Sequence, residues 1–451
     1  MNRSRLVLMC TPSSDDGAPV RGTPEVPRSA LTERFDFHSL SQWPRTAEAE
    51  GDSGRRQPAG QAYDAADVLL LDTAEAWWSH YHHPRHDTVV LDDRWGALTL
   101  PLLQARRSAS EEDDVGEDHD HDYGHDHHRS VPDTTKLPAA LGQDSIVGEY
   151  ALRANAAAYG LHPPAARPID AALLAGARTV LLPLPRSLDT LRDWAWLIAE
   201  NAHDDVVLLA GGRDKHMTHA MNDVLAEHFA HVIPGRGRSK ARVLTARGPQ
   251  RGRPRPYPRT AIHDIAQTKP FTLVSQGAVY GGSKVDPGTR FLLQALHTPE
   301  EHTIVRRSSR VVDLGCGNGT VSVVLGLEHP RQRFLAADHS ASAIASAGQS
   351  AEANGLTSRV ELLREDGLRG LPDGSEELIV LNPPFHQGNA VDAGVAHRLI
   401  AEAGRVLAPG GHLYCVWNSH LQYRRVLERQ VGPTVQLDRN PKFTVTRSTV
   451  A

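Results

Sequence analysis

Short apolar runs alternate with longer alanine-rich or amphipathic stretches along both halves of the chain. Apolar runs of this kind, bounded by turn residues, predict buried strands, and the stretches between them predict helices. Strands that alternate with helices are typical of a largely parallel sheet with helices on both faces. The pattern therefore predicts an α/β fold with two tandem Rossmann-like, doubly wound sheets.

Several landmarks of the C-terminal half recur in the same order in the N-terminal half, which predicts an internal duplication. Any two α/β halves share some similarity by chance, so the evidence for duplication is the common order of the matched segments. The matched segments, with the C-terminal one first in each pair, are Val311–Asp313 with Thr88–Asp92, Ala337–Leu356 with Gln143–Leu161, Ile379–Pro384 with Val180–Pro185, and Gly411–Val416 with Asp205–Ala210.

Two polar stretches interrupt this pattern. Residues 1–55 are rich in Ser, Pro, Asp, Arg and Gly, which predicts a mostly disordered tail with one short ordered piece around Phe35–Phe37. Residues 106–135 include the acidic, histidine-rich run Glu111–His128, which predicts a solvated loop. Its histidines could chelate a transition metal, but a charged loop explains the run more simply, and we predict no metal site.

A third biased stretch, Gly235–Thr260, carries nine cations and no acid. This composition fits a solvated linker, and it equally fits a surface that contacts RNA phosphates and stacks a base on Tyr257. The proline-rich later part predicts the boundary between lobes. The predicted divisions are the tail (1–55), a first lobe (56–248), a linker (249–262) and a second lobe (263–451).

Composition places the chain among ordinary globular proteins. Of 451 residues, 40% are hydrophobic and 23% are charged, and the net charge is −5 at pH 7. No apolar run reaches the length of a membrane-spanning helix, and the apolar run at the start is short for a signal peptide. Three cysteines are too few to form the disulfide framework of a secreted protein, so we expect a cytoplasmic protein without membrane partners. The oligomeric state stays open, with a monomer as the expectation.

The sharpest chemical signal is a glycine-rich loop after a predicted strand, VVDLGCGNGT, which contains Gly315, Gly317, Asn318 and Gly319. Glycines allow backbone to approach a ligand closely. Asp313 lies just before this loop, where a carboxylate would repel a pyrophosphate but would suit a cationic ligand. S-adenosylmethionine is such a ligand, because it carries an ammonium and a sulfonium and no phosphate.

Two further acids follow the next strands. Asp338 ends the strand after the glycine loop, where a carboxylate can accept hydrogen bonds from ribose hydroxyls. Asp366, beside Gly367, could accept from an adenine amine, although a turn cap explains it equally well.

The tetrapeptide Asn382-Pro383-Pro384-Phe385 follows an apolar strand, at the sheet edge where a substrate would meet the cofactor. The lone pair of an exocyclic amine is delocalised into its ring, so acceptors on its two hydrogens favour the pyramidal, nucleophilic form. The Asn382 side-chain oxygen and the Pro383 carbonyl suit that role, and Phe385 could stack on an extruded base. We therefore predict that this tetrapeptide carries the catalysis.

The motifs DLGCGNG, NPPFHQGNAVD (Asn382–Asp392) and WNSHLQYRRVLE with the later NPKFTV resemble the RsmC/RlmG-type ribosomal RNA guanine-N2 methyltransferase family. The likeness extends into the first lobe through Ala62–Leu70, Leu91–Leu98 and Gly212–His219. It implies two fused class I methyltransferase lobes, of which only the second binds S-adenosylmethionine. The first lobe would be a degenerate copy that helps to hold RNA.

The resemblance implies methylation of the N2 amine of a guanine in ribosomal RNA or a ribosomal subunit, with large-subunit RNA slightly favoured. The same tetrapeptide would also serve another amine or amide methyltransferase, acting on adenine N6 or on a protein glutamine. From a different class, the chain could be a noncatalytic RNA-binding assembly factor.

Overall fold

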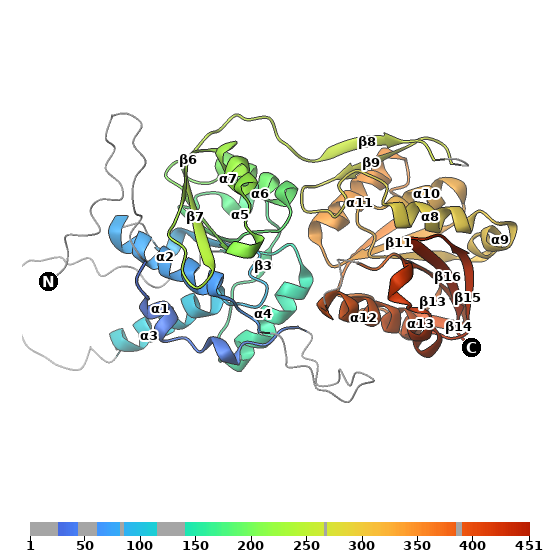
Figure 1. Cartoon of the computed structure of the whole chain (residues 1–451), viewed down its shortest axis with the longest axis horizontal. Helices are drawn as coiled ribbons and strands as arrows, with labels where there is room; N and C mark the ends of the chain where they lie inside the picture. Colours follow the sequence, from blue (N-terminus) through green and yellow to red (C-terminus); the bar gives the residue numbers. More distant parts are fainter. Residues whose placement is uncertain (1–25, 44–60, 82–84, 115–139, 266–267, 385–389) are drawn as a thin grey trace, which may run out of the picture. The chain divides into compact units, whose positions relative to one another are not determined.

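The computed structural model describes residues 26–43, 61–81, 85–114, 140–265, 268–384 and 390–451. The chain divides into two compact units, residues 1–254 and 255–451, so the boundary lies inside the segment predicted as a linker. Each unit contains one seven-stranded sheet with helices packed on it (Figure 1).

The two sheets have the same strand order, which confirms the tandem doubly wound fold. The first sheet runs β3-β2-β1-β4-β5-β7-β6, and the second runs β12-β11-β10-β13-β14-β16-β15. In both, five strands are parallel and the final hairpin is antiparallel. The order reverses beside β1 and β10, so a ligand crevice is expected at the carboxyl ends of those strands.

The elements of the first unit follow the predicted alternation of strands and helices. Its strands are β1 (Thr88–Leu91), β2 (Ala140–Gly142), β3 (Ala166–Arg167), β4 (Thr179–Pro183), β5 (Val207–Arg213), β6 (Phe229–Pro234) and β7 (Ala241–Pro249). Its helices are α1 (Ala30–Glu33), α2 (Ala65–Tyr81), α3 (Thr99–Asp114), α4 (Ile146–Ala158), α5 (Ala171–Leu174), α6 (Leu188–Asn201) and α7 (His219–Ala226).

The second unit adds a separate hairpin of β8 (Arg259–His263) and β9 (Phe271–Ser275) to its main sheet. The main sheet consists of β10 (Arg310–Leu314), β11 (Arg333–Asp338), β12 (Val360–Arg364), β13 (Glu376–Leu381), β14 (Leu407–Asn418), β15 (Thr434–Arg439) and β16 (Phe443–Thr449). The helices are α8 (Pro287–Leu296), α9 (Pro299–Arg307), α10 (Thr320–Glu328), α11 (Ala341–Ala353), α12 (Ala390–Val406) and α13 (Arg424–Gln430).

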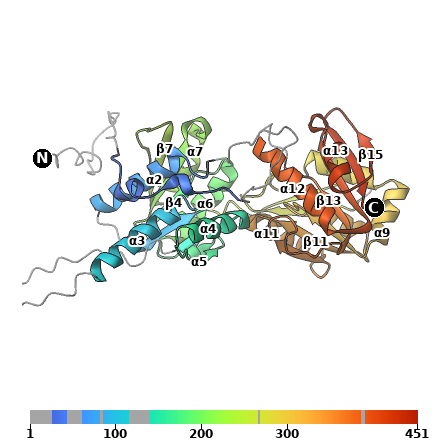
Figure 2. The ribbon, with the colours of Figure 1, turned by 90° about the horizontal axis from the view of Figure 1, so that it is seen from below.

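Alternate residues of the second sheet enter two different cores, as the twofold repeat of a strand requires. On β10, Val311 packs with residues of α8 to α11, whereas Val312 packs with residues of α12 and α13. Figure 2 shows α12 and α13 beside β13 in the second unit. Both faces are covered, so these strands read as continuous apolar runs in the sequence.

The predicted tail contains a packed segment at residues 26–43, so the ordered piece is longer than the sequence predicted. The expected ordered piece around Phe35–Phe37 is confirmed: both phenylalanines are buried, and Phe35 stacks on Tyr159 at 4.9 Å between ring centroids. Composition did not predict the length of this piece, because a few apolar residues are enough to order a segment that packs on a neighbouring surface. The remainder of the predicted tail lies outside the described residues.

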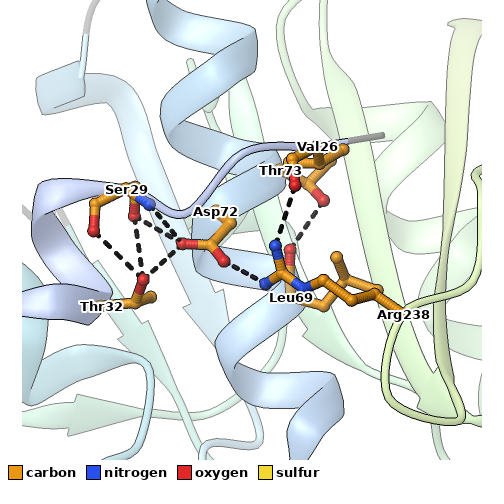
Figure 3. Close-up of polar contacts among 7 residues, drawn as sticks. All are labelled: Val26, Ser29, Thr32, Leu69, Asp72, Thr73 and Arg238. Atoms are coloured by element: carbon orange, nitrogen blue, oxygen red, sulfur yellow. Dashed lines mark hydrogen bonds and ion pairs between the residues drawn. The ribbon is translucent and has the colours of Figure 1, made fainter. Parts of the chain in front are cut away.

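A buried carboxylate ties this segment to the first unit (Figure 3). Asp72 of α2 accepts hydrogen bonds from the Ser29 backbone N–H at 2.9 Å and the Ser29 hydroxyl at 2.7 Å, and from the Thr32 hydroxyl. Arg238 pairs with the same carboxylate and donates to the Val26 carbonyl at 2.9 Å. The buried charge is thus compensated by an opposite charge and by several donors, as burial demands.

Two predictions for the biased stretches need correction. Helix α3 continues to Asp114, so the first part of the predicted acidic loop is helical, while residues 115–139 lie outside the described residues. Tyr257 is buried, with the Arg259 guanidinium 4.6 Å from its ring centroid, so it does not offer a face for base stacking. About a third of the basic stretch forms β7, which pairs with β5 and β6 inside the first sheet.

Candidate active site

The glycine-rich loop after β10 leaves bare backbone beside open space. Gly315, Gly317 and Gly319 have φ angles of +73°, +54° and +80°, which favour glycine. A Cβ added to Gly315 or Gly317 would meet no atom within 4 Å, whereas one on Gly319 would lie 2.9 Å from the Ala347 Cα. The first two glycines therefore form an open cradle, and the third lets α10 pack closely on α11.

Asp338 is held in place at the edge of this cradle. One carboxylate oxygen accepts the Gly317 N–H at 3.1 Å, and the other accepts the Ser340 N–H at 3.0 Å. The side chain is half-buried at the end of β11. A carboxylate has about four acceptor positions, so Asp338 retains the capacity to bind further donors such as two hydroxyls.

Asp313 lies deeper than its neighbours, because it faces the first turn of α10. The carboxylate is 3% exposed and accepts the Ser322 N–H at 3.0 Å and the Ser322 hydroxyl at 2.8 Å. Burial raises the pKa of Asp313 to about 6, against the opposing effect of the Ser322 hydrogen bonds. Asp313 thus stabilises the start of α10, and the oxygen that Ser322 does not use is the one available to a ligand.

Two other candidate cofactor residues make contacts within the protein. Both polar atoms of the Asn318 side chain are engaged: Nδ2 donates to the Gly282 and Lys284 carbonyls, and Oδ1 accepts from Thr320. Asn318 therefore ties the glycine-rich loop to the chain before α8 and leaves ligand contact to the backbone. The Asp366 carboxylate lies 3.4 Å from an Arg398 nitrogen of α12, and its predicted contact with an adenine amine stays a prediction.

Asn382, directly after β13, has a carboxamide with a defined orientation. Its Nδ2 donates to Asp286 Oδ2 at 3.0 Å and to Thr289 Oγ1 at 2.9 Å. A carboxylate only accepts hydrogen bonds, so the atom facing Asp286 must be the nitrogen. The side-chain oxygen accepts no hydrogen bond within the described part of the chain, and it is therefore the acceptor that Asn382 can offer. Pro383 is buried and Pro384 is exposed, while Phe385 lies outside the described residues.

Two further residues of this site, Asp286 and Thr289, were not predicted from the sequence as site residues. Asp286 caps α8 by accepting from the Gly288 and Thr289 N–H groups, at 2.8 and 3.0 Å. The motif Asp-Pro-Gly-Thr before an apolar helix is a recognisable N-cap signal. That signal predicts a helix start, and it does not reveal that the same carboxylate reaches Asn382.

The first unit has lost the corresponding groups, position by position. Equivalent positions follow from matching backbone hydrogen bonds: Asp92 N–H to Gly142 O, and Gly315 N–H to Ala337 O, both at 2.8 Å. This register gives four equivalent pairs, with the residue of the first unit named first. They are Asp92 with Gly315, Arg94 with Gly317, Gln143 with Asp338, and Val90 with Asp313. Val90 pairs with Leu181 as Asp313 pairs with Val380, which places Pro183 at the position of Asn382.

The loop of the first unit is also filled by its own side chains. The Asp93 carboxylate accepts the N–H groups of Gly96, Leu98 and Thr99, at 3.0, 3.1 and 2.7 Å. Gly96 corresponds to Gly319 by the same register, and a Cβ on Gly96 would lie 2.8 Å from a Leu152 methyl group, so this third glycine serves close packing in both units. In the first lobe, side chains therefore stand at the positions of Gly315 and Gly317, and neither the Asp313 carboxylate nor the Asp338 carboxylate has a counterpart.

A seven-stranded sheet of this order, with an open glycine-rich loop and an acid after the next strand, defines a Rossmann-like methyltransferase. Residues 270–447 match the family model described as the methyltransferase small domain, and residues 134–250 match the RLMG N-terminal domain. These two matches fall in different units, so both halves of the fold carry a family signature. The class of protein is thus a methyltransferase.

Relatives identify the particular family within this class. The chain is 31% identical to ribosomal RNA large subunit methyltransferase G of Streptomyces coelicolor, over 86% of this chain and 94% of that protein. It is 32% identical to the protein of the same name from Pseudomonas aeruginosa, over 86% of this chain and 93% of that one. The chain belongs to the ribosomal RNA large subunit methyltransferase G family, which confirms the resemblance seen in the sequence.

A solved structure shares the fold of both units. It is the T. thermophilus 16S rRNA N2 methyltransferase RsmC in complex with AdoMet and guanosine, with a TM-score of 0.63 and 22% identity. The match covers 82% of this chain and 93% of that one. In the described part of this chain, every helix is too short or too polar to cross a membrane.

Proposed function

We propose that this protein transfers a methyl group from S-adenosylmethionine to the exocyclic N2 amine of a guanine in large-subunit ribosomal RNA. The observation that carries the proposal is the oriented carboxamide of Asn382 at the carboxyl end of β13. The names of the curated relatives favour large-subunit RNA, and the guanosine bound to RsmC favours guanine as the target base. With ribosomal RNA as its substrate, the protein would act in the cytoplasm.

In this proposal, the second unit would provide a protein group for each part of the cofactor. S-adenosylmethionine supplies an electrophilic methyl group on a sulfonium. Asp338 would accept from the ribose hydroxyls, and Asp313 would attract the ammonium group through its carboxylate. The open backbone at Gly315 and Gly317 would allow close approach, because no side chain stands between loop and ligand. Asp366 would accept from the adenine amine.

The substrate amine would be held between two acceptors, the Asn382 side-chain oxygen and the Pro383 carbonyl. Hydrogen bonds to both amine hydrogens draw the lone pair out of conjugation and aim it at the methyl carbon. Methyl transfer would exchange the carbon–sulfur bond of the cofactor for a nitrogen–carbon bond, with the bonding pair left on sulfur and the displaced proton lost to water. Alignment of this kind supplies several kcal/mol of the barrier reduction, about 7 or more in favourable cases. Phe385 would stack on the extruded base.

The buried carboxyl of Asp313 predicts how cofactor binding depends on pH. Its pKa is raised to about 6, so the group gains a proton as pH falls below 6 and no longer attracts an ammonium. Affinity for S-adenosylmethionine is expected to be highest above pH 7 and to fall about tenfold by pH 5. Calorimetry across this range checks the expectation. Asp313→Asn should bind more weakly and lose this pH dependence; an unchanged slope in that variant would show that another group titrates.

The activity itself is tested by mass spectrometry of ribosomal RNA nucleosides from cells with and without the protein. Loss of N2-methylguanosine from large-subunit RNA is the expected result, and adding the purified protein with S-adenosylmethionine should restore it. Loss of N6-methyladenosine, or of methylglutamine from a protein, would instead assign one of the other amine or amide substrates. Unchanged modification together with absent cofactor binding would favour a noncatalytic assembly factor.

A further inference from the structure

The first turn of α8 and the end of β13 are joined by a small hydrogen-bond network. Asn382 has two amide protons, and its nitrogen has two acceptors, Asp286 Oδ2 at 3.0 Å and Thr289 Oγ1 at 2.9 Å. Turning the carboxamide over would place its oxygen against a carboxylate, and both atoms would then be acceptors without a proton between them. The network therefore permits only one orientation of the side chain.

The carboxylate in this network is itself fixed. Asp286 Oδ2 also accepts the N–H groups of Gly288 and Thr289, so the N-terminus of α8 holds it. A Cβ on Gly288 would lie 3.0 Å from Asp286 Oδ2, 3.3 Å from Phe443 Cε1 and 3.6 Å from Asn382 Nδ2. Glycine at this position lets the helix turn, the Phe443 ring and the carboxamide approach one another.

We propose that Asp286 and Thr289 are positioning residues for methyl transfer, which aim and polarise the carboxamide of Asn382. The inference rests on the proposed function and adds to it the groups that make Asn382 competent. Donation from the amide nitrogen to an anion shifts electron density toward Oδ1, because hydrogen bonds in a chain strengthen one another. A more negative Oδ1 holds the hydrogen of the substrate amine more tightly and favours the pyramidal nitrogen.

The duplicated lobe shows that capping and orienting are separable functions of this aspartate. Asp64 begins α2 in the same way, and its Oδ1 accepts the Ala66 N–H at 2.6 Å. The position of Asn382 is occupied there by Pro183, which has no amide to orient. The first lobe thus keeps the cap without the carboxamide. Asp64→Ser is therefore a matched control for a change at Asp286 that preserves a cap.

Three variants test the proposal. Asp286→Ser keeps a good N-cap residue, but the serine side chain is too short to reach Asn382. Asp286→Asn keeps an acceptor of the same size and removes its charge. Thr289→Val removes the second acceptor of the Asn382 nitrogen. The expected fall in kcat is about 100-fold for Asp286→Ser and about tenfold for each of the others, from the usual effect of losing an oriented polar group. The cofactor Kd, the KM for RNA and the melting temperature should stay near wild type, as should kcat of Asp64→Ser.

A spectroscopic readout separates orientation from activity. The side-chain NH₂ signals of Asn382, identified by their loss in Asn382→Ala, should shift in Asp286→Ser and Thr289→Val, because their acceptors are gone. Wild-type kcat in Asp286→Ser and Thr289→Val would show that Asp286 only caps α8. A cofactor affinity that falls by the same factor as kcat in these variants would likewise contradict a positioning role. Wild-type turnover in Asn382→Ala would instead overturn the proposed chemistry, whatever the Asp286 variants do.

Discussion

Asn382→Ala is expected to lower kcat by about 100- to 1000-fold while the affinity for S-adenosylmethionine stays within about twofold. Removal of one preorganised polar group at a reacting centre typically has an effect of this size. The carboxamide contacts Asp286 and Thr289, and in the proposed function its oxygen faces the substrate, so its loss should weaken transition-state binding rather than cofactor binding. Single-turnover kinetics on RNA and calorimetry with the cofactor measure the two quantities separately.

Pro183→Ala is the matched control, because Pro183 occupies the position of Asn382 in the first lobe. It should leave kcat unchanged if chemistry belongs to the second lobe alone. A wild-type rate for Asn382→Ala would contradict the assignment of its oxygen as an acceptor for the amine.

Asp338→Ala is expected to weaken cofactor binding about 100-fold, and the wild-type chain should bind one equivalent of cofactor. Two hydroxyl hydrogen bonds to a carboxylate are worth about 1.5 kcal/mol each or more. Asp338 also accepts the Gly317 N–H, so its removal loosens the glycine-rich loop as well. Titration calorimetry with S-adenosylmethionine measures both the affinity and the stoichiometry.

A variant in the first lobe controls for this second expectation. Asp92→Gly restores a glycine at the position that corresponds to Gly315 and relieves a non-glycine residue with φ of +49°. It should create no second site, because the Asp93 carboxylate still occupies the amides of that loop. Two equivalent sites in the wild-type chain would disprove the degeneracy of the first lobe.

The most reliable sequence signals were those whose cause is local. Apolar runs followed by Asp338 or Asn382 predicted strand ends, which the structure confirms, and strand ends of a parallel sheet share one edge, so the residue pattern was enough to propose where the site lies. The glycines of the loop were informative for a similar reason: a φ near +70° is a property of single residues. The common order of landmarks predicted the duplication, and the identical strand orders confirm it at the level of fold.

Predictions from composition were weaker, because composition does not say which surface a segment meets. Residues 26–43 look like the rest of the tail, yet Phe35 and the Asp72 contacts fix them on the first unit. Tyr257 lies in a basic, proline-rich stretch that suits RNA, yet the fold buries its ring. In both cases the deciding contacts come from residues distant in the sequence.

The sequence by itself therefore determined the fold class and the family resemblance, and it led to the proposal that the second lobe carries the chemistry at its strand ends, since these depend on periodicity and on residue types at short spacing. Only the tertiary structure decided how the side chains act. It brings Asp286 to Asn382 across 96 positions of the chain, turns Asp313 toward Ser322, and closes the loop of the first lobe with Asp93. Such pairings depend on the packing of helices against the sheet, which no local pattern records.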